Sequence, residues 1–351
     1  MSSTHFLIVG SGLIGTSIAL ALVGEGHTVS LEDADSNVLR LAQDLIGKNS
    51  VEKTPDYVIV ATPPDSIFPT IQAKYQLYPH AIFIDVGSTK NKLILDVERF
   101  SELSERFVGT HPMAGREFSG AASAQADLFH GRAWIVVPTS RTLPKVLTAV
   151  TTLIETVGAT VYQMDGLSHD QLLARISHLP QALSTALAGS LLDVATGMEL
   201  SGQGLRDTTR LADSSGELWS EIFIANKGAI IDALDLFSAQ LQKLRSSIES
   251  NDVEQIVKLF NEGKKGRSRV SGKHGAQPRD YVYLMIVIKD EPGALKTLFE
   301  ECAEVNANIE DLSIEHSPKQ ETGLITLAFS PGDSQRVLEH LHKRNWKVHA
   351  R

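Results

Sequence analysis

Apolar positions in the first part of the chain follow two alternating patterns. Short continuous apolar runs are separated by longer segments in which apolar residues recur with helical spacing, as in residues 38–45, 66–73 and 145–157. Such alternation predicts a parallel sheet covered by helices on both faces, here over residues 1–166. The predicted strands are residues 5–9, 28–31, 57–61, 81–85, 107–109, 134–137 and 160–162.

A different pattern covers residues 167–262. Strand-like runs give way to long helical periodicities at residues 171–196 and 217–250, in which leucine and alanine dominate and helix-stop residues are sparse. We expect an all-helical domain that buries some of its apolar faces against a second copy of the chain. The predicted assembly is therefore a homodimer.

Residues 263–278 have the composition of a linker. They contain five basic residues, four glycines and no acid. A nucleic-acid-binding arm is one interpretation, but no aromatic residue interleaves with the charges, which favours a solvated flexible linker.

Short strands return in residues 279–351. The pattern predicts strands at 281–288, 308–316, 322–329 and 346–349, and helices at 293–305 and 334–344. This β-α-β-β-α-β order is that of a ferredoxin-like unit.

Composition and charge limit the classes of function. The net charge of −9 argues against nucleic acid or an anionic membrane as the main partner. The one cysteine, Cys302, excludes an internal disulfide and a cysteine-based zinc site, so we predict no metal site and expect a small buried residue there. No apolar run is long enough to suggest a membrane span, and the chain enters a strand without a signal region. We expect a cytoplasmic protein.

A glycine motif follows the first predicted strand directly. Gly10-Ser11-Gly12-Leu13-Ile14-Gly15 lies between a strand and a helix, which is the context in which G-x-G-x-x-G binds a dinucleotide. Gly10 permits the tight turn, Gly12 lets the backbone approach the pyrophosphate, and Gly15 lets the helix pack closely on the sheet. The helix N-terminus attracts the phosphates. The alternative is a glycine turn that serves packing only.

Three acids near the end of the second strand favour NAD over NADP. Asp33 is placed to bind the ribose hydroxyls. Together with Glu32 and Asp35 it would repel a 2′-phosphate. We therefore predict a Rossmann-like domain with NAD as its cofactor.

Polar residues gather at the ends of the later strands. Thr62 and Pro63 follow the third strand, where a cofactor contact and a plain loop are both open interpretations. Ser88 follows the fourth strand, and His111 is expected in a short loop just after the fifth. A histidine is the natural group to take a proton from a hydroxyl at neutral pH. Because the chain has 12 histidines, an ordinary surface histidine is the alternative.

Five motifs occur in an order that resembles one enzyme family. They are the glycine motif, Gly87-Ser88-Thr89-Lys90, His111-Pro112-Met113-Ala114-Gly115, Ser177-His178-Leu179-Pro180 and Arg206-Asp207-Thr208-Thr209-Arg210. In this order they resemble the prephenate/arogenate dehydrogenases of tyrosine biosynthesis over essentially the whole chain. The resemblance implies that NAD oxidises the ring alcohol of prephenate and that the ring carboxylate is lost as carbon dioxide, which gives 4-hydroxyphenylpyruvate.

The resemblance also implies roles for single residues. His111 is implied to accept the hydroxyl proton, and Ser88 to bridge the nicotinamide, the hydroxyl and the histidine. Arg210 is implied to grip a substrate carboxylate, and Arg206, one helical turn before it, to add positive charge at the same face. A solvated helix face is the alternative for both arginines.

Two further residues match the family. His178 matches a second histidine near the substrate, and Trp219 matches a tryptophan that reaches a neighbouring subunit's site. A helix cap is the alternative for His178, and core or dimer packing is the alternative for Trp219.

One departure from the family concerns the choice of substrate. Gln181 stands where many members that use prephenate carry another histidine, close to the expected position of the substrate side chain. A neutral amide can meet the keto acid of prephenate or the amino acid of arogenate. We favour prephenate and keep arogenate dehydrogenase and a dual-specificity cyclohexadienyl dehydrogenase as alternatives.

The segment Asp290-Glu291-Pro292-Gly293-Ala294-Leu295 resembles the ligand loop of ACT domains, which are ferredoxin-like modules that bind amino acids. The expected effector residues are Asp290, Pro292, Gly293, Leu295 and Asn308. Tyrosine or phenylalanine is the expected effector, and a module without ligand is the alternative.

Two other functions compete with this interpretation. A β-hydroxyacid dehydrogenase would rely on a lysine in the helical domain, whereas this chain places His111 and an arginine pair around the substrate. An amino-acid sensor on a silent dehydrogenase scaffold would have no need for the intact glycine motif, Asp33, Ser88, His111 and Arg210.

Overall fold

The computed structural model describes residues 4–47, 54–114, 120–270, 281–289, 291–316 and 322–350. The chain divides into two compact units, Met1–Ser250 and Asn251–Arg351. No helix in the described part is both long and apolar enough to cross a membrane.

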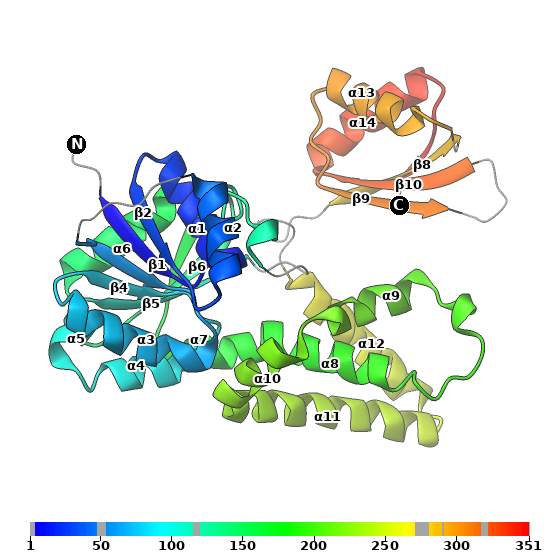
Figure 1. The fold of residues 1–351 in the computed structure, drawn as a ribbon. Coiled ribbons are helices and arrows are strands. Elements are labelled where there is room, and N and C mark those ends of the chain that lie inside the picture. Colours follow the sequence, from blue (N-terminus) through cyan, green and yellow to red (C-terminus); the bar gives the residue numbers. More distant parts are fainter. Residues whose placement is uncertain are drawn as a thin grey trace. The chain divides into compact units, whose positions relative to one another are not determined.

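The first unit is built on a seven-stranded sheet with the order β2-β1-β3-β4-β5-β6-β7 (Figure 1). Neighbouring strands run parallel, as predicted, except for β5 and β6, which are antiparallel. An antiparallel pair does not need the crossover helix that joins neighbouring parallel strands. The strands are β1 (His5–Val9), β2 (Thr28–Glu32), β3 (Tyr57–Val60), β4 (Ile82–Asp85), β5 (Phe107–Pro112), β6 (Ala133–Pro138) and β7 (Thr160–Gln163).

Helices cover both faces of this sheet (Figure 1). On one face α1 (Leu13–Gly24), α2 (Ser36–Ile46) and α6 (Pro144–Thr156) form a core cluster with the sheet around Phe6 and Leu22. The opposite face is covered by α3 (Pro64–Leu77), α4 (Asn91–Val97), α5 (Ser101–Glu105) and α7 (Gly166–Leu173), which pack around Phe83 and Phe107. The predicted Rossmann-like architecture is confirmed.

The helical segment after β7 is more broken than the sequence predicts. The expected helix 171–196 consists of α7, a π turn (Ala174–His178) and α8 (Leu179–Gly189). Pro180 has no amide hydrogen to continue a regular helix, and the wider turn lies just before it. After α8 follow α9 (Gln203–Thr209), a 3₁₀ turn (Arg210–Asp213), α10 (Gly216–Ala225) and α11 (Lys227–Glu249).

The expected helix 217–250 is likewise two helices, with a break at Asn226. The backbone of Asn226 has φ −114° and ψ 26°, outside the helical region. Its side-chain amide donates a hydrogen bond to the carbonyl oxygen of Asp170 at 2.8 Å. A tertiary contact therefore sets the break, which the apolar periodicity could not reveal.

The second unit begins with α12 (Val253–Ser268), so the expectation of a flexible linker from residue 263 is wrong for residues 263–268. The Asp252 side chain caps this helix by accepting from the amide of Gln255 at 2.9 Å. Lys265 and Arg267 lie in its last turn, where positive charge suits the negative end of the helix dipole.

A four-stranded antiparallel sheet with the order β11-β8-β10-β9 forms the rest of the second unit. Its elements are β8 (Val282–Lys289), α13 (Ala294–Glu304), β9 (Asp311–His316), β10 (Thr322–Phe329), α14 (Pro331–Lys343) and β11 (Lys347–Ala350). The order of strands and helices is the one predicted. Cys302 is buried in the core of this unit, as expected.

Candidate active site

The glycine motif lies at the carboxyl ends of β1 and β3, which are neighbours in the sheet. Gly10 has φ +102°, and a Cβ there would come within 2.4 Å of the Ala61 carbonyl oxygen. A Cβ on Gly15 would come within 1.9 Å of the Gly10 carbonyl oxygen. Both positions therefore require glycine. Gly12 lies at the N-terminus of α1, where an added Cβ would meet open space.

The acid at the end of β2 is tied to this turn. The Asp33 carboxylate accepts from the amide of Ser11 at 2.6 Å and from the amide of Asp35 at 2.8 Å. Its neighbour Glu32 forms an ion pair with Lys74. Asp33 therefore lies beside the turn expected to hold the pyrophosphate, at the place where a ribose-binding carboxylate is needed.

Two hydroxyl groups beside the turn fit a bound dinucleotide. The side-chain oxygens of Ser11 and Thr62 are buried without a hydrogen-bond partner among the described residues. A buried hydroxyl without a partner costs free energy, and a ligand with many polar atoms would relieve that cost. Of the other expected cofactor residues, Leu13 and Ile14 pack against the core cluster of this face, and Pro63 precedes α3. The residues present thus fit NAD.

A cavity of about 940 Å³ lies between the sheet and the helical segment of the first unit. It collects Ser88 from the turn after β4, His111 from β5, and His178, Gln181, Arg210 and Trp219 from the helical segment. Of the residues expected to bind or convert the substrate, only Arg206 is outside this set. Its guanidinium donates to the Ser201 carbonyl oxygen at 2.8 Å, and it lies in α9, whereas Arg210 begins the following 3₁₀ turn. The two arginines therefore do not share one regular helix face.

His111 belongs to a strand, so the expectation of a loop position is wrong. Strand β5 extends through Pro112, and His111 is paired with Ile135 of β6. The partner strand β6 was predicted, but its antiparallel direction was not, and this pairing extends β5 beyond the apolar run. His111 is consequently held by the sheet itself. Gly115, at the end of the same motif, lies outside the described residues.

A chain of hydrogen bonds runs from His111 to a buried carboxylate. His111 Nδ1 is 3.0 Å from His169 Nε2, and His169 Nδ1 is 2.7 Å from Asp170 Oδ1. Because a carboxylate only accepts, His169 donates from Nδ1 and its Nε2 accepts in the neutral ring. His111 must then donate from Nδ1. The neutral ring of His111 therefore keeps its lone pair on Nε2, available to a substrate proton.

Asp170 also joins the helical segment to the sheet. Its two carboxylate oxygens accept from the amides of Lys90 at 2.8 Å and Asn91 at 2.9 Å, at the start of α4. Lys90 in turn forms a fully buried ion pair with Asp85 at the end of β4. Ser88 lies in the turn between these two residues. The carboxylate that orients the histidines thus also anchors the turn that presents Ser88.

The two histidines that line the cavity, His111 and His178, and the His169 ring bonded to His111 are neutral at pH 7. Burial holds the pKa of His111 well below 6.5, and the nearby His169, Lys90 and His178 lower it further. Burial also lowers the pKa of His169, against the opposing effect of its hydrogen bond to Asp170. The pKa of His178 is lowered to about 4, again mainly by burial. His111 can therefore accept a proton at neutral pH.

His169 and Asp170 were not among the residues predicted from the sequence. The available signal was a histidine next to an aspartate in the first helix after the sheet, where the helical segment begins. Asn226 was also missed; its side-chain nitrogen lies 3.2 Å from His178 Nδ1 and donates to it. Trp219 packs edge-on against His178, with ring centroids 6.0 Å apart.

Two family models match this chain. Residues 18–163 match the nucleotide-binding domain of prephenate dehydrogenase, and residues 165–262 match its dimerization domain. The cyclohexadienyl dehydrogenase of Zymomonas mobilis is 30% identical over 78% of this chain and 98% of that protein. The chain belongs to the prephenate dehydrogenase family.

Two further proteins of the same family are similar to this chain over most of its length. The prephenate dehydrogenase of Bacillus subtilis is 28% identical over 95% of this chain and 94% of that protein. The crystal structure of prephenate dehydrogenase from A. aeolicus, in complex with hydroxyphenyl propionate and NAD+, is 31% identical with a TM-score of 0.71. That match covers 77% of this chain and 99% of the other.

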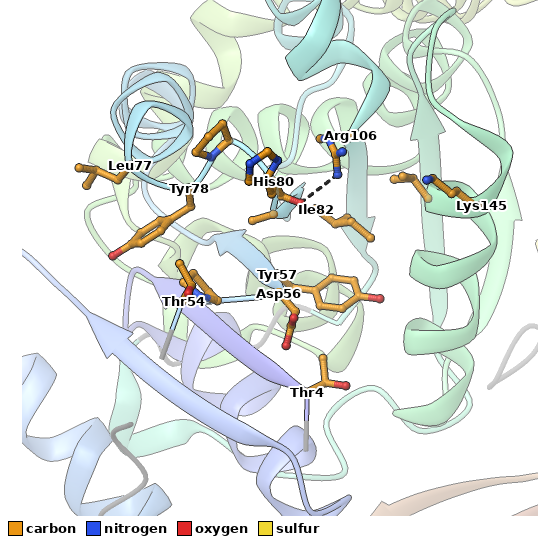
Figure 2. Close-up of a pocket in the computed structure, with 14 residues that line it drawn as sticks. Thr4, Thr54, Asp56, Tyr57, Leu77, Tyr78, His80, Ile82, Arg106 and Lys145 are labelled. Atoms are coloured by element: carbon orange, nitrogen blue, oxygen red, sulfur yellow. Dashed lines mark hydrogen bonds between the residues drawn. The ribbon is translucent and has the colours of Figure 1, made fainter. Parts of the chain in front are cut away.

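A second hollow in this prephenate dehydrogenase family member, of about 720 Å³, lies at the amino ends of β1, β3 and β4 (Figure 2). Tyr57, Arg106 and Lys145 are among its lining residues, and Arg106 donates to the His80 carbonyl oxygen at 2.9 Å. Dinucleotides bind at the carboxyl ends of parallel strands. This hollow lies at the opposite ends of the strands from the glycine turn.

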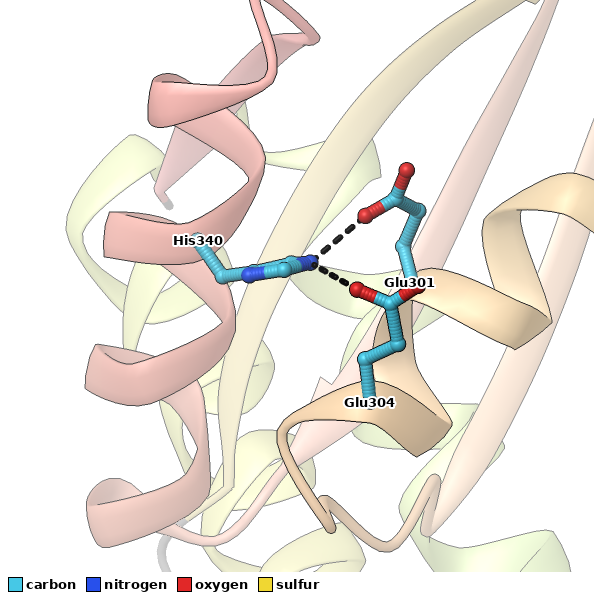
Figure 3. A group of neighbouring side chains, drawn as sticks. All are labelled: Glu301, Glu304 and His340. Carbon is cyan, nitrogen blue, oxygen red and sulfur yellow. Dashed lines mark hydrogen bonds and ion pairs between the residues drawn. The ribbon is translucent and has the colours of Figure 1, made fainter.

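Three side chains of the second unit have the types that ligate metals. Potential ligand atoms of Glu301, Glu304 and His340 lie within 4.8 Å of one another, between α13 and α14 (Figure 3). His340 Nε2 is 2.5 Å from Glu301, and Arg344 contacts Glu304 at 3.0 Å and Glu301 at 3.7 Å. Because Arg344 already supplies positive charge to both carboxylates, we interpret the group as an ion-pair cluster that joins the two helices.

Three of the expected effector residues lie at the start of α13, and Asn308 lies between α13 and β9. Pro292 and Gly293 are exposed, Leu295 is half-buried, and the exposed Asn308 donates to Glu310 at 3.1 Å. Gly293 has φ +93°, a conformation that favours glycine. Asp290 lies outside the described residues.

Proposed function

We propose that this protein is a prephenate dehydrogenase that converts prephenate and NAD to 4-hydroxyphenylpyruvate, carbon dioxide and NADH. The observation that carries the proposal is the geometry of His111. Its Nε2 is the unprotonated nitrogen of a neutral ring, and His111 lies on the wall of a cavity that Ser88 and Arg210 also line.

The reaction needs a proton acceptor at the ring hydroxyl. As the C4–H bond breaks with its electron pair, His111 Nε2 takes the hydroxyl proton and the C4 oxygen becomes a carbonyl. The bond to the ring carboxylate then breaks, carbon dioxide leaves, and its electron pair makes the ring aromatic. The phenolate oxygen recovers a proton from His111. NAD, held by the glycine turn and Asp33, supplies the hydride acceptor.

The charges of the cavity favour prephenate over arogenate. Arg210 contributes a cation, and none of the described lining residues is a carboxylate. The guanidinium can grip a carboxylate of the substrate. The ammonium group of arogenate would find no carboxylate among these residues, whereas prephenate carries no cation. The similarity to a cyclohexadienyl dehydrogenase keeps dual specificity as the second candidate.

Parallel assays with two substrates and two cofactors test the proposal. NADH or NADPH formation is followed with prephenate and with arogenate, each with NAD and with NADP. We expect the highest kcat/KM for prephenate with NAD. Absence of turnover with both substrates would contradict the proposed function, and a higher kcat/KM for arogenate would contradict the choice of substrate.

The helical segment supports a homodimer, and we place the dimer in the cytoplasm. The helical segment matches a dimerization domain, and its helix α11 has exposed apolar side chains, among them Ile231, Leu236 and Leu241. Exposed apolar faces of this kind typically pack against a partner. Sedimentation at the mass of two chains is expected, and a monomer at micromolar concentration would contradict the dimer.

The second unit supports a regulatory ACT domain. Its β-α-β-β-α-β order, with the first and third of its strands at the centre of the sheet, is that of a ferredoxin-like fold. Tyrosine is the proposed effector, bound at the loop before α13. Inhibition by tyrosine should weaken in Gly293→Val, which places a branched side chain at a positive φ. Unchanged inhibition would exclude this loop as the effector site.

A further inference from the structure

Gln181 uses most of its hydrogen-bonding capacity inside the protein. The residue is 4% exposed, and its Nε2 donates to the Leu211 carbonyl oxygen at 2.7 Å and to Thr185 Oγ1 at 3.3 Å. Its Oε1 accepts from Ser214 Oγ at 3.4 Å. A carbonyl oxygen can only accept, so the amide orientation is fixed by Leu211. Both N–H groups of the amide are therefore occupied.

The partners of Gln181 belong to the segment that presents Arg210. Leu211 lies next to Arg210 in the 3₁₀ turn Arg210–Asp213, and Ser214 follows that turn directly. Arg210, Leu211, Ser214 and Gln181 all line the same cavity. A short 3₁₀ turn has poor internal hydrogen-bond geometry, so bonds from a rigid neighbouring helix fix its position. Gln181 supplies two of these bonds from the first turn of α8.

We infer that Gln181 is a positioning residue, which holds the Arg210 turn in place for the substrate carboxylate and does not distinguish the side chains of prephenate and arogenate. An N–H of Gln181 would have to leave Leu211 or Thr185 before it could donate to the keto group of prephenate. The ammonium group of arogenate could donate only to Oε1, which already accepts from Ser214 Oγ. This corrects our expectation that the amide faces the substrate side chain. The identity of the substrate in this inference rests on the proposed function. The hydrogen bonds between Gln181 and the Arg210 turn do not depend on that function.

Near-isosteric variants test the role of the amide. Gln181→Met keeps the length of the side chain but loses every hydrogen bond, and Gln181→Glu loses both donors. We expect each variant to raise KM about tenfold for prephenate and for arogenate alike, with kcat within about threefold and NAD affinity unchanged. A change in the ratio of kcat/KM between the two substrates of more than about tenfold would overturn the inference.

A double-mutant cycle separates positioning from direct contact. In an Arg210→Ala background, Gln181→Met should have little further effect on KM, because Gln181 acts through Arg210. Full additivity of the two effects would overturn the inference. Thr185→Val is the matched control: it removes only the partner within α8 and should leave KM unchanged.

Amide hydrogen exchange provides a readout that does not depend on turnover. Exchange in residues 210–214 should be faster in Gln181→Met than in the wild type and in Thr185→Val. Unchanged exchange would overturn the inference even in an active enzyme. If the wild type turns over neither substrate, the proposed function fails, and the exchange result still decides whether Gln181 holds this turn.

Discussion

His111 Nδ1 lies 3.0 Å from His169 Nε2, and this contact selects the nitrogen of His111 that faces the substrate. Asp170 fixes the proton of His169, and His169 fixes that of His111. The proposed base is thus oriented by two residues from the start of the helical segment. Its function depends on how that segment docks on the sheet.

Replacement of His169 should slow catalysis without weakening NAD binding. In His169→Phe the Nδ1 proton of His111 has no partner, so the ring can rotate or adopt the other tautomer. We expect kcat to fall about 10²-fold or more, with the NAD Kd from titration unchanged. His5→Asn is the control, because His5 is also buried but is bonded to Ser30 away from the site. Equal kcat in His169→Phe and the wild type would contradict the orienting role.

The pH profile of kcat/KM should be flat through the ordinary pKa of histidine. Only neutral His111 accepts a proton, and burial holds its pKa well below 6.5. Activity is therefore retained as pH falls from 8 through 6.5 and is lost only as pH falls through the lowered pKa. Steady-state assays over this range check the prediction. An acid limb centred at or above about 6.5 would contradict a buried neutral base.

Loss of Lys90 should destabilise the fold strongly. Lys90→Met leaves the fully buried Asp85 carboxylate without its counter-ion. Breaking such a pair typically costs about 3–5 kcal/mol, here expected as a lower free energy of unfolding in urea. The double variant Asp85→Leu/Lys90→Met should recover much of the loss. A single variant as stable as the wild type would show that the pair is not needed.

Replacement of Arg210 should raise the KM for prephenate much more than replacement of Arg206. Arg210→Ala removes a guanidinium from the cavity wall and should raise the KM for prephenate about 10²-fold with a smaller effect on kcat. Arg206→Ala, outside the cavity, should change KM by less than about threefold. Steady-state kinetics of both variants check these two predicted changes in KM. Equal increases would place Arg206 at the substrate as well.

The sequence predicted those features that depend on local pattern. The strands of the sheet, the glycine turn with Asp33, and the residues Ser88, His111 and Arg210 follow from apolar runs, turn chemistry and motifs. Features set by contacts between distant segments were not predictable in this way. The antiparallel pairing of β6 extended β5 over His111, and the reach of Asn226 to Asp170 broke a long helix.

Contacts between the helical segment and the sheet of the first unit could not be predicted from the sequence either. His169 and Asp170 carry no motif, and they matter because α7 packs beside α4 and β5. Gln181 was identified from its place in a motif, but its role depends on Leu211, 30 positions later. Arg206 shows the converse, because one-turn spacing in the sequence does not survive the change from an α-helix to a 3₁₀ turn.

The most direct test of this account compares His111→Ala with the wild type in two measurements, kcat with prephenate and Kd for NAD. The account predicts that kcat falls by about 10²–10⁴-fold while Kd stays within about threefold, because His111 acts on the substrate proton and does not hold the cofactor. A variant that keeps kcat within a few fold of the wild type would contradict the assignment of His111 as the base.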